Sequence, residues 1–276
     1  MNYRYFDAHC HVQFEDYAHD EEEVIARMRE NGISGIVVGV DRSSSEKAVR
    51  LAEKYDNLYA SVGLHPNVVG SERLDLDAFR TLAAHPKVVA IGECGLDYYR
   101  PKELTEEVKR AQAEALRAQI DLAAFLDKPL IIHSRPSKGT PSSVKATEGT
   151  QDAYHDLIGI LKEKKVEHGA KVRGDIHFFV GGVAEAEALF VLDFTVSFTA
   201  VITFARDYDA VIRSAPLNRI LSETDAPYLS PASRRHERND PLAVEEVVAK
   251  LAEIRGEELE SVRTAVVANA ARVFGL

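Results

Sequence analysis

Short apolar runs alternate with longer segments of helical periodicity from one end of the chain to the other. Such alternation is typical of repeated βα units around a parallel sheet. The runs expected to form strands cover residues 5–9, 33–40, 58–64, 88–93, 129–133, 175–179, 194–198 and 219–224. Eight such strands in one chain predict an α/β fold, a (β/α)₈ TIM barrel whose strands form a closed inner ring.

Segments with helical patterns separate these runs, at residues 20–30, 45–54, 105–126, 152–168, 184–192 and 206–213. A further helix is expected after Asp240, a favourable N-cap, with Pro241 in its first turn and Gly256 after its end. Residues 136–150 interrupt the rhythm, because they are rich in Ser, Thr, Gly and Pro and have no period. We expect a long loop insertion there, acting either as a lid or as an inert surface segment.

The 276 residues are interpreted as one domain, 1–276, because α/β barrels of about 200–250 residues commonly fold as a unit. Two cysteines cannot build a disulfide framework, and no signal segment or membrane-length apolar run is present, so a cytoplasmic location is expected. The net charge of −10 disfavours extended wrapping on nucleic acid, but it leaves local phosphate recognition open. Nothing in the sequence indicates an obligate protein partner.

Candidate chemistry lies at the strand ends. Six side chains that commonly bind metals stand at or just beyond the ends of five expected strands: His9, His11, Glu93, His133, His177 and Asp225. Because the carboxyl ends of barrel strands meet on one face, these residues are expected to form one cluster. Strand alternation directs His9, His11 and Glu93 inward, and it directs Cys10 and Cys94 outward, where they are expected to pack against helices.

Four imidazoles and two carboxylates exceed the needs of one tetrahedral site and suit two divalent metals bridged by a carboxylate, for which Glu93 is the best candidate. A metal-bound water loses its proton more easily and can then attack a substrate. Asp225 is expected to bind a metal and accept a proton, so Asp225 and Glu93 are the candidate catalytic residues. A single strand-end histidine is usually a hydrogen-bonded structural residue. Six ligands on one face favour a functional site.

Two further residues are expected near this cluster. His65 ends the third expected strand and could meet a substrate phosphate or orient the metal-bound water; a helix-capping or supporting role fits equally. Glu223 is expected one layer below Asp225, as a buried hydrogen-bonding partner of a ligand.

Seven motifs carry a resemblance to a known family: DAHCH (7–11), SVGLHP (61–66), AIGECGLDYY (90–99), PLIIHSR (129–135), IHFFVGG (176–182), SETDAPYLSP (222–231) and NDP (239–241), followed by the ending NAARVFGL. Over nearly its whole length the chain resembles the TatD family of metal-dependent deoxyribonucleases, within the amidohydrolase-like barrels. The resemblance implies a metallo-dependent hydrolase that cleaves phosphodiester bonds in DNA, often from a 3′ end. It also implies two divalent metals, one held by His9, His11, Glu93 and Asp225, the other by Glu93, His133 and His177.

The expected partner is DNA or an oligonucleotide end, and the candidate substrate-binding residues are His65, Arg135 and Arg235. Basic residues expected near the mouth form either a phosphate rim or a solvated surface: Arg100, Lys102, Arg135, Arg206, Arg234, Arg235 and Arg238. Histidine-rich ligation favours zinc, iron or manganese, whereas enzymes of this family are generally described as magnesium-dependent. The ion therefore stays open between Mg²⁺, Mn²⁺ and Zn²⁺.

Two other functions are compatible with the same residues. An amidohydrolase-type enzyme would cleave an amide, ester or lactone with the same two-metal site. Many such barrels bridge their metals with a carboxylated lysine, whereas the segment VVAIGECG offers Glu93 and no lysine. A non-catalytic metal-binding barrel would need a closed site without exchangeable water. The pattern favours phosphodiester hydrolysis by a metal-activated water.

Overall fold

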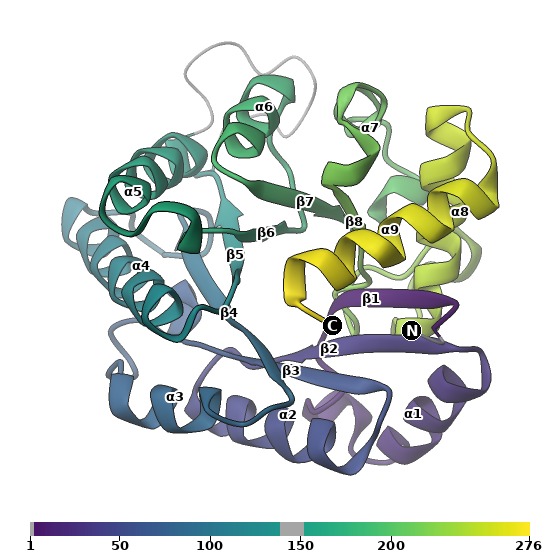
Figure 1. The fold of residues 1–276 in the computed structure, drawn as a ribbon, viewed down its shortest axis with the longest axis horizontal. Helices are drawn as coiled ribbons and strands as arrows, with labels where there is room; N and C mark the ends of the chain where they lie inside the picture. The colour runs from purple at the N-terminus through teal and green to yellow at the C-terminus, as the bar shows by residue number, and fades with distance from the viewer. Residues whose placement is uncertain (1–2, 139–151) are drawn as a thin grey trace.

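The computed structural model describes residues 3–138 and 152–276, which contain a barrel of eight parallel strands. The strands are β1 (Tyr5–Cys10), β2 (Ile33–Val38), β3 (Leu58–Val62), β4 (Val88–Asp97), β5 (Leu130–Arg135), β6 (Gly174–His177), β7 (Phe194–Phe198) and β8 (Ile220–Ser222). Each pairs with the next along the chain, as Figure 1 shows. The His11 amide donates to the Ala226 carbonyl at 2.8 Å and joins the end of β1 to the segment after β8. The predicted TIM barrel is confirmed.

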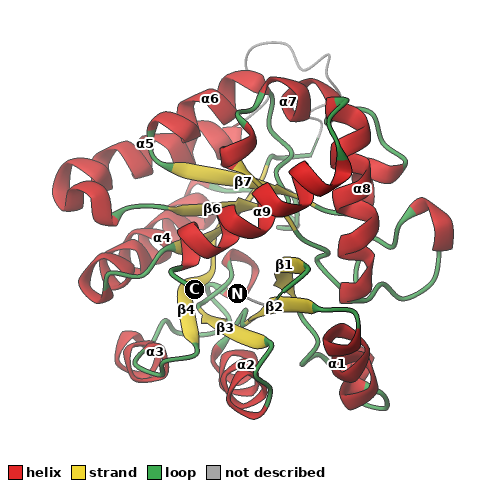
Figure 2. Cartoon of the chain, turned by 45° about the vertical axis from the view of Figure 1, so that its right-hand side comes forward, coloured by secondary structure: helices red, strands yellow, loops and turns green. Residues whose placement is uncertain are grey.

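Helices surround the strands on the outside (Figure 2). In the described residues they are α1 (Glu21–Glu30), α2 (Arg42–Lys54), α3 (Leu76–Ala83), α4 (Glu106–Leu126), α5 (Asp152–His168), α6 (Val183–Val191), α7 (Asp209–Ser214), α8 (Val244–Arg255) and α9 (Leu259–Phe274). Their apolar faces and the strands form one large buried cluster. Cys10 and Cys94 belong to this cluster, as predicted, and their thiols donate to the carbonyls of Ile36 and Ile131.

The C-terminal helix α9 lies across the barrel at the end where the strands begin (Figures 1 and 2). Its Asn269 donates to the carbonyl of Ile220, the first residue of β8, at 2.9 Å. Phe274 at the end of α9 belongs to a second buried cluster with Phe6 and Leu221. Apolar side chains therefore fill this end of the barrel, and the polar residues gather at the opposite end, where the strands finish.

Strand β4 differs most from the prediction, because it continues to Asp97 beyond the expected end at Glu93. Its last residues pair with β5, with Cys94 opposite Ile132 and Asp97 opposite Arg135. The sequence pattern missed this extension, since glycine has a low β propensity and only pairing with β5 holds the segment extended. Strand β8 is shorter than the expected 219–224. The structure also contains α3 and α9, two helices that the sequence pattern did not predict.

Gly95 allows β4 and β5 to approach closely. Its φ is +145°, and a Cβ at this position would lie 1.9 Å from the carbonyl oxygen of His133. Glycine alone tolerates both the conformation and the contact. The two strands therefore hold Glu93 and His133 side by side near the end of the barrel.

The helix predicted after Asp240 is confirmed. The Asp240 carboxylate accepts from the Leu242 amide at 3.1 Å and starts a turn at Pro241 that leads into α8, and Gly256 follows with a φ of +66°.

Of the insertion expected at 136–150, residues 139–150 lie outside the described residues. Among the described residues, no helix has the length and apolar character needed to cross a bilayer. The single domain and the cytoplasmic location stay predictions.

Gly95→Ala is expected to lower the free energy of unfolding by at least about 2 kcal/mol, because the methyl group overlaps the His133 carbonyl and the positive φ is strained for alanine. Gly159→Ala is the matched control, since a Cβ in this part of α5 meets nothing within 4 Å. It should raise stability by about 0.5–1 kcal/mol. Urea unfolding measures both variants, and equal stabilities would contradict the close approach of β4 and β5.

Candidate metal centre

The six predicted ligands come together at the end of the barrel where the strands finish. Four lie in strands and two follow them: His9 in β1, Glu93 in β4, His133 in β5, His177 at the end of β6, His11 after β1 and Asp225 after β8. Ligand atoms of His9, Glu93 and His177 lie within 4.8 Å of one another, as do those of His9, His11 and Asp225. Each of the six is buried or half-buried. The barrel thus gathers residues that are far apart in the sequence into one cluster.

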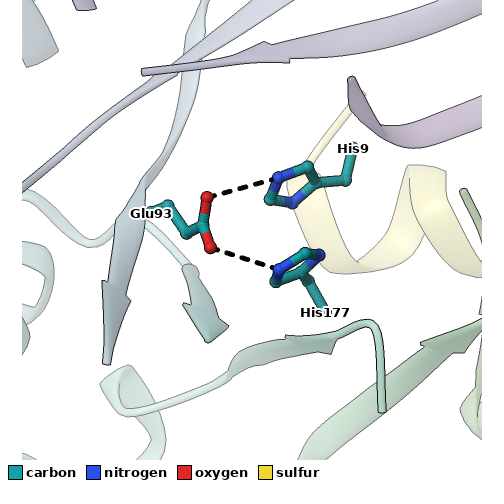
Figure 3. A group of neighbouring side chains, drawn as sticks. All are labelled: His9, Glu93 and His177. Atoms are coloured by element: carbon teal, nitrogen blue, oxygen red, sulfur yellow. Dashed lines mark ion pairs between the residues drawn. The ribbon is translucent and has the colours of Figure 1, made fainter. Parts of the chain in front are cut away.

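The carboxylate of Glu93 lies at the centre, and its two oxygens face different histidines. Oε2 is 3.4 Å from His9 Nε2 and 3.9 Å from His11 Nε2. Oε1 is 3.1 Å from both His133 Nδ1 and His177 Nε2. Figure 3 shows the two oxygens directed separately to His9 and His177. One carboxylate therefore separates two groups of imidazole nitrogens, which is the geometry expected of a bridging ligand.

Asp225 completes the group around His9 and His11. Its Oδ1 is 3.5 Å from His11 Nε2 and 3.8 Å from His9 Nε2. The two Nε2 atoms are themselves 3.1 Å apart. Nitrogens that converge in this way share a proton or direct their lone pairs to a common point. A cation at that point would be stabilised by all three residues.

The second ring nitrogen of three histidines is held by an oxygen behind the cluster. His11 Nδ1 lies 2.8 Å from the carbonyl of Val38, and His177 Nδ1 lies 3.2 Å from Glu223 Oε2. His133 Nε2 is held in the same way by Asp97. Metal-binding histidines commonly donate their other N–H to such an oxygen, which fixes the tautomer and the ring orientation. Glu223 is buried and contacts His177, a predicted ligand, as expected.

The carboxylates of the cluster stay ionised despite their burial. Burial raises the pKa of Glu93, but the electrostatic influence of His65 and His177 and the hydrogen bonds from His133 and His177 outweigh this effect and hold the pKa well below its ordinary value. Burial also raises the pKa of Asp225, and the hydrogen bond from His11 helps to lower it overall. Ionised carboxylates beside oriented imidazoles are a donor set that fits divalent metal ions.

Asp97 is a supporting residue that the sequence pattern did not single out. It is fully buried, and its Oδ2 lies 3.2 Å from His133 Nε2. Its Oδ1 accepts from the amides of Tyr99 and Arg100, each at 2.9 Å. The carboxylate thus ties His133 to the loop that follows β4. The alternation of a strand places residues 93, 95 and 97 on one face, so the signal existed in the sequence once β4 is carried past Glu93.

His65 has the capping role that the sequence left open, and it also contacts the cluster. Its Nδ1 accepts from the amide of Asn67 at 3.0 Å and caps the short turn Pro66–Val68. Because Nδ1 acts as an acceptor, the proton of the neutral ring is on Nε2. That atom lies 3.1 Å from Glu93 Oε1. His65 is therefore a hydrogen-bond donor at the edge of the cluster.

A cavity of about 660 Å³ opens above the cluster. Its charged and imidazole lining includes His11, His65, Glu93, Arg100, His133, Arg135, His177 and Asp225. Its aromatic lining, among the described residues, consists of Phe14, Tyr99, Phe178, Tyr208 and Tyr228. The candidate site therefore combines a charged floor with aromatic walls.

The expected basic rim lies only partly at this cavity. Arg135 lines it, whereas Arg234 and Arg238 form ion pairs with Asp240 and Asp20. Arg235, which was also expected at the rim, has its guanidinium carbon 3.9 Å from the centre of the Phe204 ring. It is not among the residues that line the cavity. Binding of a phosphate by Arg135 or Arg235 stays a prediction.

The chain is similar to known proteins over nearly its whole length. The TatD related DNase family matches residues 6–275. The uncharacterized metal-dependent hydrolase YabD of Bacillus subtilis is 37% identical over 273 residues, which cover 98% of each chain. The 3′-5′ ssDNA/RNA exonuclease TatD of Erwinia amylovora is 31% identical, over 98% of this chain and 100% of its own. The crystal structure of YJJV, a TatD homolog of Escherichia coli K12, aligns over 100% of both chains with a TM-score of 0.84 and 28% identity.

Asp97→Asn is expected to weaken the binding of divalent metal ions by about 10–100-fold. An amide N–H facing His133 Nε2 cannot accept the ring N–H, so the substitution would no longer fix the tautomer and orientation of this ring. Asp156→Asn is the matched control, since it alters the hydrogen bond of Tyr98 beside Asp97 and leaves His133 untouched. Calorimetric titration of the metal-free proteins with Mn²⁺ measures the affinities. If Asp97→Asn binds Mn²⁺ as tightly as the unaltered protein, Asp97 has no role in orienting a ligand.

Proposed function

The chain belongs to the family of TatD-related DNases and is a metal-dependent hydrolase, and we propose that it removes nucleotides from the 3′ end of DNA or oligonucleotides. The proposed reaction is hydrolysis of a phosphodiester bond at two divalent metal ions. The name of the Erwinia amylovora relative, a 3′-5′ ssDNA/RNA exonuclease, supports this choice of substrate.

The position of Glu93 is the observation that carries the proposal. On the side of its Oε2, the residues that would hold one ion are His9, His11 and Asp225. On the side of its Oε1, the residues that would hold the second are His133 and His177. Such ions supply a water of lowered pKa and a Lewis acid for phosphate oxygens. Measurement of activity after metal exchange would distinguish Mg²⁺, Mn²⁺ and Zn²⁺ as the ions.

Two carboxylates would serve the reaction in different ways. Asp225 lines the cavity and its side chain is 13% exposed, which supports its proposed role as the acceptor of a proton from an attacking water. Glu93 has an exposed side-chain fraction of only 4% and contacts histidines through both oxygens. Its proposed role is to hold the two halves of the site at a fixed separation.

Three residues are proposed to bind the phosphates. His65 presents its Nε2–H at the edge of the cluster, where the same proton can be donated to a phosphate oxygen. Arg135 supplies a positive charge within the cavity. Arg235 lies outside the lining and is therefore assigned to a phosphate farther along the strand. In a chain of net charge −10, such local groups must supply the attraction for a polyanion.

The shape of the site supports action at an end. The cavity of about 660 Å³ falls within the range of about 300–1,000 Å³ that is common for small-ligand pockets. Below it the barrel is filled by buried side chains such as Phe6 and Leu221. A strand can enter by its terminus but cannot pass through, and this favours removal of terminal nucleotides.

Asp225→Asn, His9→Ala and Glu93→Gln are each expected to lower kcat on a single-stranded oligonucleotide by at least about 10²-fold, because each removes a ligand or a proton acceptor. Circular dichroism should show an intact fold. Arg235→Ala is the comparison variant, and it should raise KM while metal content stays unchanged. Removal of metal with a chelator should abolish turnover, and added Mg²⁺, Mn²⁺ or Zn²⁺ should restore it.

The outcome that rejects this assignment is near-normal turnover, with unchanged metal content, in all three ligand variants. A substrate panel separates the reaction classes. Oligonucleotides, carboxylic esters, lactones and cyclic amides are offered to the same metal-loaded protein. Hydrolysis of an amide, ester or lactone without cleavage of any oligonucleotide would replace the nuclease with an amidohydrolase-type enzyme.

A further inference from the structure

Two successive tyrosines after β4 point to opposite sides. The hydroxyl of Tyr98 donates to Asp156 of α5 at 2.8 Å, and the ammonium of Lys109 in α4 lies 5.3 Å from the centre of the same ring. Tyr98 is 2% exposed, so it anchors this segment to the outer helices. Tyr99 is 41% exposed and lines the cavity. The second ring is thus part of the cavity wall, where the ammonium of Lys138 lies 5.5 Å from its centre.

An arginine from the neighbouring strand covers the ring of Tyr99. The guanidinium carbon of Arg135, the last residue of β5, lies 3.9 Å from the centre of the ring. The backbone fixes the pair, because the amide of Tyr98 donates to the carbonyl of Arg135 at 2.9 Å. An arginine at this distance is held by cation–π attraction. The Tyr99–Arg135 stack is therefore a preformed flat surface in the wall of the cavity.

This stack has a fixed position relative to the metal centre. Asp97 accepts from the amide of Tyr99 at 2.9 Å with one oxygen, and its other oxygen lies 3.2 Å from His133 Nε2. A single buried carboxylate thus connects a predicted metal ligand to the backbone of the stacking residue. A substrate that contacts both must carry its anionic group and its flat ring at a matching separation.

Isolated exposed aromatics are ordinary on protein surfaces and need no explanation. Here, however, the exposed ring of Tyr99 is covered by an arginine and lies beside the proposed site of phosphodiester hydrolysis. The same cavity is also lined by Tyr228, which is 46% exposed. A nucleotide is the substrate that carries both a phosphate and a flat ring. Aromatic and guanidinium surfaces stack on any nucleobase, so they bind single strands with little preference for sequence.

We propose that the Tyr99–Arg135 stack receives the nucleobase next to the scissile phosphate and so selects unpaired 3′ ends. This inference rests on the proposed nuclease function. A base in a duplex must leave its partner and its neighbours before it can stack on Tyr99. A single-stranded base has no partner to leave, so the free-energy cost of moving it onto the ring is smaller. The stack therefore favours single strands without reading their sequence.

The test compares variants at Tyr99 on oligonucleotides that have or lack a base. Tyr99→Leu keeps apolar bulk but removes the ring, and Tyr99→Phe keeps the ring. Phe125→Leu is the matched control, because Phe125 of α4 is 63% exposed and stacked by Arg80 at 4.5 Å but does not line the cavity. The substrates are one single-stranded oligonucleotide and two versions with an abasic site at the last or the penultimate 3′ position.

Tyr99→Leu is expected to lower kcat/KM on the intact strand about tenfold, equivalent to about 1.4 kcal/mol. On the version that lacks the stacked base, the same variant should differ from the unaltered enzyme by less than about twofold, since no base is left to stack. Tyr99→Phe and Phe125→Leu should match the unaltered enzyme on each of the three strands. An equal loss on the intact and both abasic strands, or no loss on any, overturns the stack as a base-binding surface.

A binding measurement separates this inference from the proposed function. Rapid mixing of the metal-loaded protein with an oligonucleotide that carries 2-aminopurine at its 3′ end should quench the probe, and Tyr99→Leu should remove most of the quenching. Such quenching without cleavage of any oligonucleotide would reject the nuclease function and keep the stack. Cleavage with quenching unchanged in Tyr99→Leu would keep the nuclease and reject the stack.

Discussion

The contact of one buried carboxylate with imidazoles on both of its sides is the constraint on which the site depends. Glu93 can face His9 through one oxygen and His177 through the other only if the strand ends of a closed barrel converge around it. Closure is completed locally, since the amide of Asp225 donates to the carbonyl of His9 at 2.9 Å. The close approach of β4 to β5 at Gly95 sets the position of His133 on the far side.

The support behind the ligands extends this constraint outward. Carboxylates at Asp97 and Glu223 hold ring nitrogens of His133 and His177 at 3.2 Å, so both rings are oriented before any ion binds. Asp97 also fixes the amide of Tyr99, and the geometry of the cluster therefore reaches the wall of the cavity. The predicted metal ligand His133 and the proposed base-binding surface are therefore connected through one segment, the end of β4 and the turn that follows.

The sequence was sufficient for the barrel and for the grouping of the six predicted ligands, because strand periodicity and the carboxyl-end rule do not depend on detailed contacts. Asp97 was missed because Gly95 breaks the strand pattern, and only pairing with β5 continues β4. The aromatic part of the cavity wall could not be predicted, since the different environments of Tyr98 and Tyr99 depend on a partner in α5. Side chains of loops, such as Arg235 with its ring contact, are placed by tertiary packing that periodicity does not encode.

The most direct test of the central claim is a crystal structure of the protein loaded with Mn²⁺, with the ions located by anomalous scattering. The account predicts two peaks, one on each side of the Glu93 carboxylate: the first beside His9, His11 and Asp225, the second beside His133 and His177. Two such ions should lie about 3.5–4 Å apart. A single ion, or ions that do not contact Glu93, would contradict the bridging role from which the proposed chemistry follows.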